Sequence, residues 1–125
     1  MDIVYKPHKF QQSFHRSSAR IRLAAAAKRS GKSEAGAVES IIFAEQQRGY
    51  KPNGIDPYLG VVIAPTSDML RRLSLQKLKA YAGNMITEHH ETHGELTWHN
   101  GSKILAISAD KPQRLEGVKA SWVWL

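Results

Sequence analysis

The sequence contains no cysteine and no long hydrophobic run. The lack of cysteine excludes disulfide scaffolds, thiol catalysis and cysteine-based zinc sites, and it fits a reducing compartment. No stretch reaches the roughly 18 consecutive apolar residues of a membrane span, and the first residues, MDIVYKPHKFQQ, lack the apolar core of a signal peptide. We therefore expect a soluble, unsecreted protein without a membrane segment. Its 125 residues have room for one compact domain or part of one.

The positive charge of the chain is concentrated near its beginning. The formal net charge is +7. Residues 1–33 hold eight Lys and Arg against the single acid Asp2, whereas residues 34–125 hold ten of each sign. A diffuse basic coat would indicate general nucleic-acid affinity, but a cluster around one loop indicates a local anionic ligand, such as the phosphates of a nucleotide.

The first half of the sequence predicts a strand, a helix and a second strand. Residues 20–27, RIRLAAAA, end as an unbroken apolar run, which is typical of a strand buried on both faces. Apolar residues then recur at helical spacing from Lys32 to about Arg48, and residues 59–64, LGVVIA, form another buried run. Strand, helix and strand in this order favour a parallel βαβ unit.

The second half predicts a helix and a hairpin. Thr66 or Ser67 can cap a helix that ends at Gly83-Asn84. The apolar stripe of this helix comprises Leu70, Leu73, Leu78 and Tyr81. Short alternating segments, 95–99 and 102–108, flank Asn100-Gly101, a dipeptide that favours a type I′ turn. The loop 109–120 then leads to an apolar strand over 121–125.

One motif carries chemistry, the segment AAKRSGKS over residues 26–33. It matches the phosphate-binding loop G-x-x-x-x-G-K-[ST], except that alanine stands in the first glycine position. Such a loop lies between a strand and a helix, so that backbone amides and the helix N-terminus face the β- and γ-phosphates. The expected nucleotide-binding residues are Ala26, Ala27, Lys28, Arg29, Ser30, Gly31, Lys32 and Ser33. Lys32 would hold the phosphates and Ser33 would join the Mg²⁺ shell. The structural alternative is that Gly31 only turns the chain and Lys32 is a solvated side chain.

The order of these segments resembles a known family. Gln11 with Phe14 and His15, then RIRLAAAAKRSGKSEAG, VVIAPTSDML and LTWHNGSKILAISADKPQRLEGVKASWVWL, resemble the N-terminal ATPase domain of the large terminase subunit of tailed bacteriophages. The resemblance covers nearly the whole chain. It implies an α/β P-loop NTPase fold of the RecA/ASCE type, with a mostly parallel but incomplete sheet and a β-hairpin.

The resemblance also implies a function. Such a motor binds ATP and Mg²⁺ and hydrolyses ATP to drive double-stranded DNA into a preformed capsid, with a nuclease in a separate domain. The implied partners are DNA, the portal protein, the small terminase subunit and further copies in a ring, all in the cytoplasm of the bacterial host. In that family the strand equivalent to residues 121–125 leads to an Asp-Glu pair that orders Mg²⁺ and polarises water. We therefore interpret residues 1–125 as the N-terminal part of the ATPase domain. We expect this part to bind ATP but not to turn it over, and to be marginally stable or to aggregate by itself.

Several residues have a functional and a structural interpretation. Gln11 matches the family's adenine-contacting glutamine, although Gln12 leaves the register open and both fit a simple amphipathic helix. Lys32, Arg29 and Lys28 are the catalytic candidates, because terminases place an arginine before the glycine of the loop. Arg114 in the RLEG loop is either a finger offered to a neighbouring subunit or a partner of Asp110 or Glu116.

Other motifs are weaker. The segment Ala64-Pro65-Thr66 resembles a helicase segment near DNA, or it simply ends a strand and caps a helix. The histidines of residues 89–93, HHETH, favour a solvated loop or a short helical turn over a metal site. The three tryptophans favour packing over base stacking. Two other functions remain open, a superfamily 1 or 2 helicase module and a non-enzymatic prophage remnant.

Overall fold

The computed structural model describes residues 5–18, 32–90, 94–115 and 117–125. In chain order the elements are α1 (Lys9–Arg16), α2 (Lys32–Gln46), β1 (Leu59–Ala64), α3 (Ser67–Met69), the π-helical segment η1 (Leu70–Leu75), α4 (Gln76–Ala82), the 3-10 turn η2 (Gly83–Met85), β2 (Ile86–His90), β3 (Glu95–Trp98), β4 (Lys103–Ser108), the 3-10 turn η3 (Pro112–Leu115) and β5 (Trp122–Trp124). The α/β class expected from the sequence is therefore confirmed. None of the helices in these ranges is long and apolar enough to cross a membrane.

Within the described residues the sheet has five strands in the order β2-β3-β4-β1-β5. Strand β1 pairs in parallel with both β4 and β5, whereas β3 pairs antiparallel with β4 and β2 antiparallel with β3. The described part of the sheet is thus mixed, with two parallel and two antiparallel pairings, where the sequence predicted a mostly parallel sheet and one hairpin. The cause is β2, which occupies His89 and His90, where the sequence favoured a loop or helical turn. The strand expected over residues 20–27, and with it the parallel βαβ unit, lies outside the described residues.

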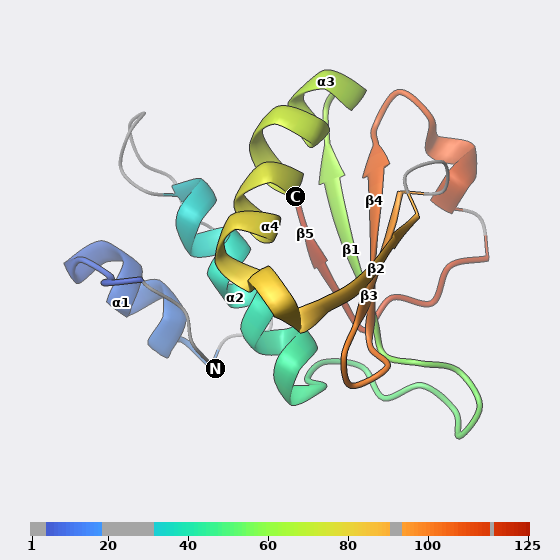
Figure 1. Ribbon diagram of the computed structural model, residues 1–125, viewed down its shortest axis with the longest axis horizontal. Coiled ribbons are helices and arrows are strands. Elements are labelled where there is room, and N and C mark those ends of the chain that lie inside the picture. Colours follow the sequence, from blue (N-terminus) through green and yellow to red (C-terminus); the bar gives the residue numbers. More distant parts are fainter. Residues whose placement is uncertain (1–4, 19–31, 91–93, 116) are drawn as a thin grey trace.

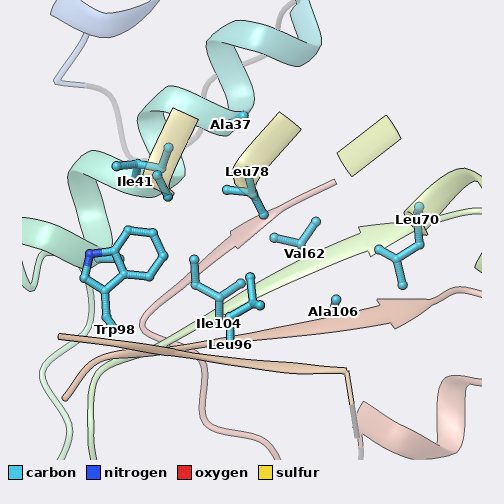
Figure 2. Close-up of a cluster of buried hydrophobic side chains, with 12 residues drawn as sticks. Ala37, Ile41, Val62, Leu70, Leu78, Leu96, Trp98, Ile104 and Ala106 are labelled. Atoms are coloured by element: carbon cyan, nitrogen blue, oxygen red, sulfur yellow. The ribbon is translucent and has the colours of Figure 1, made fainter. Parts of the chain in front are cut away.

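Helices α2, α3 and α4 cover one face of the sheet, and α1 lies on the far side of α2 (Figure 1). Figure 2 shows the core between these layers, where Ile41 of α2 and Leu78 of α4 meet Trp98 and Ile104 of the sheet. Each of these four side chains is at most 1% exposed. Burial of one such side chain contributes about 1.5–3 kcal/mol, so the contact fixes α2 against the sheet.

The hairpin between β3 and β4 forms as predicted, but its turn is of another type. A type I′ turn needs a positive φ at both Asn100 and Gly101, and among the described non-glycine residues only Gln47 has one. The Gly101 amide donates to the Trp98 carbonyl, and the Trp98 amide donates to the Ser102 carbonyl. This is the pattern of a three-residue loop that ends in a left-handed glycine, since Gly101 has φ of 91°.

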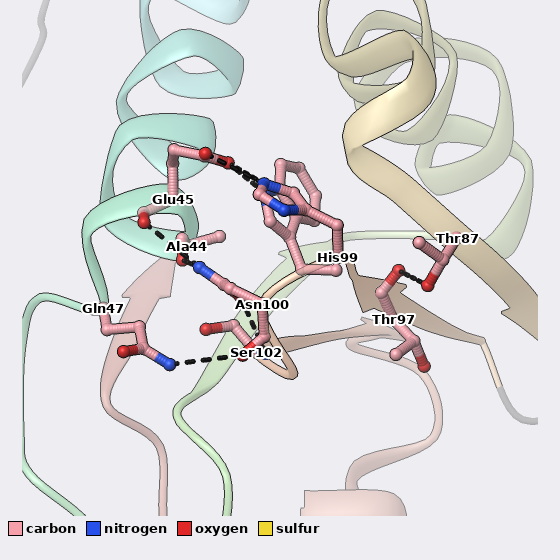
Figure 3. Close-up of polar contacts among 9 residues, drawn as sticks. Ala44, Glu45, Gln47, Thr87, Thr97, His99, Asn100 and Ser102 are labelled. Carbon is pink, nitrogen blue, oxygen red and sulfur yellow. Dashed lines mark hydrogen bonds and ion pairs between the residues drawn. The ribbon is translucent and has the colours of Figure 1, made fainter. Parts of the chain in front are cut away.

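The hairpin tip holds the C-terminal end of α2 (Figure 3). Asn100 Nδ2 donates to the carbonyls of Ala44 and Glu45 at 2.9 and 3.1 Å, and so adds a partner to carbonyls of the last helical turn. The indole Nε1 of Trp98 donates to Glu45 Oε2 at 2.8 Å, and His99 Nε2 lies 2.8 Å from the same oxygen. Burial raises the pKa of Glu45, but the bonds from His99 and Trp98 outweigh burial and leave this pKa below its ordinary value.

Candidate functional site

The candidate site lies at the N-terminal end of α2, where the helix begins at Lys32 and Ser33. Lys32 is exposed and Ser33 is half-buried. Figure 1 shows that α2 runs opposite to β1, so the beginning of α2 lies toward the edge at which β1 and β4 end. The first amides of a helix have no partner within the helix, and the helix dipole places positive potential there. A helix N-terminus of this kind attracts anions.

Two close contacts with β5 fix the position of α2 on the sheet. Gly36, in the second turn of α2, lies against the indole of Trp124, and a Cβ atom on Gly36 would come within 2.3 Å of that ring. Further along, the rings of Phe43 and Trp122 meet edge to face at 6.1 Å. Gly36 is therefore required here for its small size. The tryptophans pack within the fold, as the sequence predicted, and Trp98 is fully buried.

An ion pair joins the first turn of α2 to α4. Lys77 Nζ of α4 lies 2.5 Å from Oε1 of Glu34, and both side chains are about one-third exposed. The hydrogen bond from Lys77 lowers the pKa of Glu34 below its ordinary value, with a further contribution from the Glu34 backbone amide. An ion pair thus stands at the first turn of α2, the turn in which Lys32 and Ser33 also lie.

A second polar chain links α1 to α2. His15 Nδ1 of α1 lies 2.5 Å from Oε2 of Glu39, and its Nε2 lies 2.9 Å from the hydroxyl of Tyr5. Burial raises the pKa of Tyr5 to about 12, with further contributions from Tyr81, Glu34 and Glu39. The protonated phenol can donate to His15. These hydrogen bonds anchor α1 on the face of α2 that the sheet does not cover.

Helix α1 also carries Gln11, the candidate adenine contact. The side chain of Gln11 is 5% exposed, and its Oε1 accepts a hydrogen bond from the His8 amide at 3.0 Å. Gln12 donates from its Nε2 to the Pro7 carbonyl. Both glutamines thus take part in local contacts that stabilise the start of the helix. The nucleotide role of Gln11 stays a prediction.

Most of the predicted phosphate loop cannot be placed. Ala26, Ala27, Lys28, Arg29, Ser30 and Gly31 lie outside the described residues. Only Lys32 and Ser33 of that motif are described, and they occupy the helix start that the motif predicts.

The remaining candidates are distributed around the fold. Thr66 caps α3, since its hydroxyl accepts from the Met69 amide at 3.2 Å, which confirms the predicted cap. Arg114 is exposed in η3, and its role as a finger stays a prediction. In the described part of the chain no group of three or more His, Asp or Glu side chains could hold a metal ion.

Sequence reasoning missed Lys77 and Glu39 as parts of this region. Lys77 is 43 residues from Glu34, and Glu39 is 24 residues from His15. No local pattern connects such partners. The only usable signal was Glu34 itself, an acidic residue in the first helical turn, where the helix dipole favours negative charge.

Comparisons with known proteins find similarity to phage terminases. No family model matches it. It is 41% identical over 64 residues to the terminase large subunits of Thermus phage G20c and Thermus virus P23-45, a match that covers 51% of this chain and 12% of each relative.

Solved structures extend the similarity over nearly the whole chain. The large terminase ATPase domain of Thermus phage P74-26 matches with a TM-score of 0.71 and 27% identity, covering 95% of this chain and 52% of that one. An arginine-to-alanine mutant of the same domain matches with a TM-score of 0.69 and 28% identity. The chain thus spans about half of the solved domain and about an eighth of the curated relatives. From its sequence and its fold together, the chain is a homologue of the ATPase domain of phage large terminase subunits.

Proposed function

We propose that this chain is the ATP-binding part of a phage DNA-packaging motor, with Lys32 and Ser33 contacting the phosphates of MgATP. One observation carries the proposal. A helix that begins with this Lys-Ser pair lies with its N-terminus toward the edge where β1 and β4 end, in a fold that matches a terminase ATPase domain. In α/β sheets, ligands bind outside the carboxyl ends of the strands.

The residues at this helix start fit a triphosphate with Mg²⁺. Lys32 is exposed, so its ammonium group can reach the β- and γ-phosphates as a point charge. The Ser33 hydroxyl is a hard oxygen ligand of the kind that Mg²⁺ prefers, and bound Mg²⁺ would neutralise phosphate charge. The amides at the start of α2 supply further donors.

The rest of the motif completes the proposed site. We assign the backbone of Ala26, Ala27, Ser30 and Gly31 to the phosphate cradle and the side chains of Lys28 and Arg29 to the γ-phosphate. We keep Gln11 as the adenine contact. Because its carboxamide oxygen accepts from His8, that contact would have to use the amide nitrogen or release the existing bond.

For the whole protein we propose the terminase role. ATP hydrolysis would drive double-stranded DNA into the procapsid, in the cytoplasm of the bacterial host. Its partners would be the DNA, the portal protein, the small terminase subunit and further copies in a ring. Residues 1–125 would supply part of a P-loop ATPase domain of the RecA/ASCE type. The curated relatives are terminases, which favours this role over a helicase module.

Calorimetric titration of the 125-residue chain with MgATP tests the proposal. We expect saturable binding, and Lys32→Ala should weaken it by about 10- to 100-fold, because a hydrogen bond to a charged group contributes about 1.5–3 kcal/mol. Lys51→Ala is the matched control, since this lysine follows the opposite end of α2, and its affinity should stay within about twofold. If the unmodified chain is folded but does not bind, the proposal is wrong. If both lysine variants bind equally well, Lys32 has no phosphate role.

A further inference from the structure

Glu34 lies in a position where a bound anion would compete with it. It is the third residue of α2, and its carboxylate is the acidic group of the first helical turn. Its own backbone amide contributes to the lowered pKa, so the ionised carboxylate already takes up part of the positive potential at this helix end. A phosphate that approaches Lys32 and Ser33 meets this negative charge.

Lys77 acts in the opposite direction. It comes from α4, and its Nζ is held 2.5 Å from Glu34 Oε1. The ammonium group therefore lies beside the first turn of α2, close to where the phosphates would bind. An open hollow of about 370 Å³ adjoins Lys77 and is lined also by Arg72, Gln76, Ala80 and Tyr81, so the Lys77 side chain has free space on one side.

Both partners retain enough exposure to change contacts. The side chains of Lys77 and Glu34 are 29% and 32% exposed, and pairs this exposed are held together weakly. A polyphosphate carries several negative charges, so it can attract Lys77 more strongly than one carboxylate does. The pair can thus open at little cost when the anion arrives.

We propose that Glu34 and Lys77 set the phosphate affinity of α2 with opposite signs, Glu34 as a built-in competitor and Lys77 as a second phosphate-binding cation besides Lys32. This inference rests on the proposed function, because it assumes that the phosphates bind at the start of α2. It adds to that function a pair of opposite charges on α2 and α4, supplied by two residues 43 apart in sequence.

Charge-neutralising variants separate the two roles. The probes are MgATP and inorganic tripolyphosphate, titrated into the 125-residue chain at about 50 mM salt. Glu34→Gln should tighten binding and Lys77→Met should weaken it, each by about 3- to 10-fold, as expected for one unit charge near a partly exposed site. The double variant should return to within about twofold of the unmodified chain, and Lys77→Arg should retain its affinity because the charge is kept.

A second ion pair supplies the matched control. Glu95 and Lys103 lie 3.0 Å apart on the hairpin, with similar exposure. Glu95→Gln and Lys103→Met make the same charge changes on strands that are not joined to the first turn of α2, and binding should stay within about twofold. Circular dichroism and melting curves establish whether each variant is folded. If Lys77→Met does not fold, Lys77→Gln is used in its place.

The outcomes distinguish this inference from the function on which it rests. Affinity changes of opposite sign, larger than in the control pair and reduced at about 500 mM salt, support the inference. If Glu34→Gln and Lys77→Met change affinity in the same direction, or no more than the controls do, the inference is wrong while the nucleotide site stands. If the unmodified chain binds neither probe, both fail.

Discussion

Because Gly36 contacts Trp124, we expect Gly36→Ala to change the stability of the fold in opposite directions with and without the Trp124 indole. A glycine within a helix is less favourable than alanine by about 0.8–1.0 kcal/mol, so helix propensity by itself favours alanine at position 36. The added Cβ, however, would lie 2.3 Å from Cε2 and 2.4 Å from Nε1 of Trp124. Carbon contacts are normally about 3.5–4.0 Å long, so the helix or the indole must move by more than about 1 Å.

The two effects have different magnitudes. Overpacking of this kind costs about 1–3 kcal/mol, which outweighs the gain in helix propensity. Gly36→Ala should therefore lower the free energy of unfolding by up to about 2 kcal/mol. In a Trp124→Ala background the clash is absent, and the same substitution should instead raise the free energy of unfolding by about 1 kcal/mol.

Urea denaturation followed by circular dichroism measures all four variants of this cycle. The coupling between the two sites should be about 1–3 kcal/mol. Gly54→Ala is the control, because a Cβ there meets no atom within 4 Å, and it should change stability by less than about 1 kcal/mol. If Gly36→Ala stabilises the chain equally with and without Trp124, the packing of α2 on β5 described above is wrong.

Two further predictions concern the ends of α2. Trp98→Phe removes the indole N–H that donates to Glu45. Urea denaturation should show a loss of about 2 kcal/mol in the free energy of unfolding, because a hydrogen bond to a carboxylate contributes about 1.5–3 kcal/mol. A loss below about 0.5 kcal/mol would contradict the hydrogen bond. The hydrogen bond from Lys77 lowers the pKa of Glu34 below its ordinary value of 4.5. The ionised carboxylate therefore contributes its full stabilisation above pH 4.5, and this stabilisation is lost as the pH falls through the lowered pKa. The urea midpoint should therefore fall more steeply below about pH 4.5 in the unmodified chain than in Lys77→Met, and parallel curves would exclude the ion pair.

Local patterns predicted the elements that local forces determine. The run LGVVIA gave β1 with its observed bounds, and helical spacing gave α2 from Lys32 to within two residues of its observed end. Thr66 was identified as a cap because its hydroxyl satisfies an amide three residues away. In each case the deciding contacts lie within a few residues of sequence.

Other features depended on contacts that a local pattern does not contain. Strand β2 was missed because its polar residues form a strand only by pairing with β3, with a register shift between Ile86 and Glu88. The π-helical segment Leu70–Leu75 was expected to be regular helix, since apolar spacing does not reveal an extra residue in a turn. The hairpin turn was assigned from Asn100-Gly101 alone, yet Asn100 is fixed by its bonds to the end of α2.

The candidate site divides in the same way. The sequence motif predicted Lys32 and Ser33 at the start of a helix, and the fold places them there. The ammonium group that pairs with Glu34 comes from α4 and could not be predicted, because only the packing of α4 on α2 brings Lys77 to Glu34. The sequence thus predicted the residues proposed to contact phosphate, but not the ion pair proposed to adjust the phosphate affinity.

The central claim is that the start of α2 binds the phosphates of a nucleotide. An amide proton–nitrogen NMR titration of the labelled 125-residue chain with MgATP tests it most directly, because each backbone amide reports separately. We expect saturable shifts at the amides of Lys32 and Ser33 that adenosine without phosphates does not produce, with little change at the far end of α2 near Gln46. Saturable shifts confined to that far end, or no saturation at millimolar MgATP, would contradict the claim.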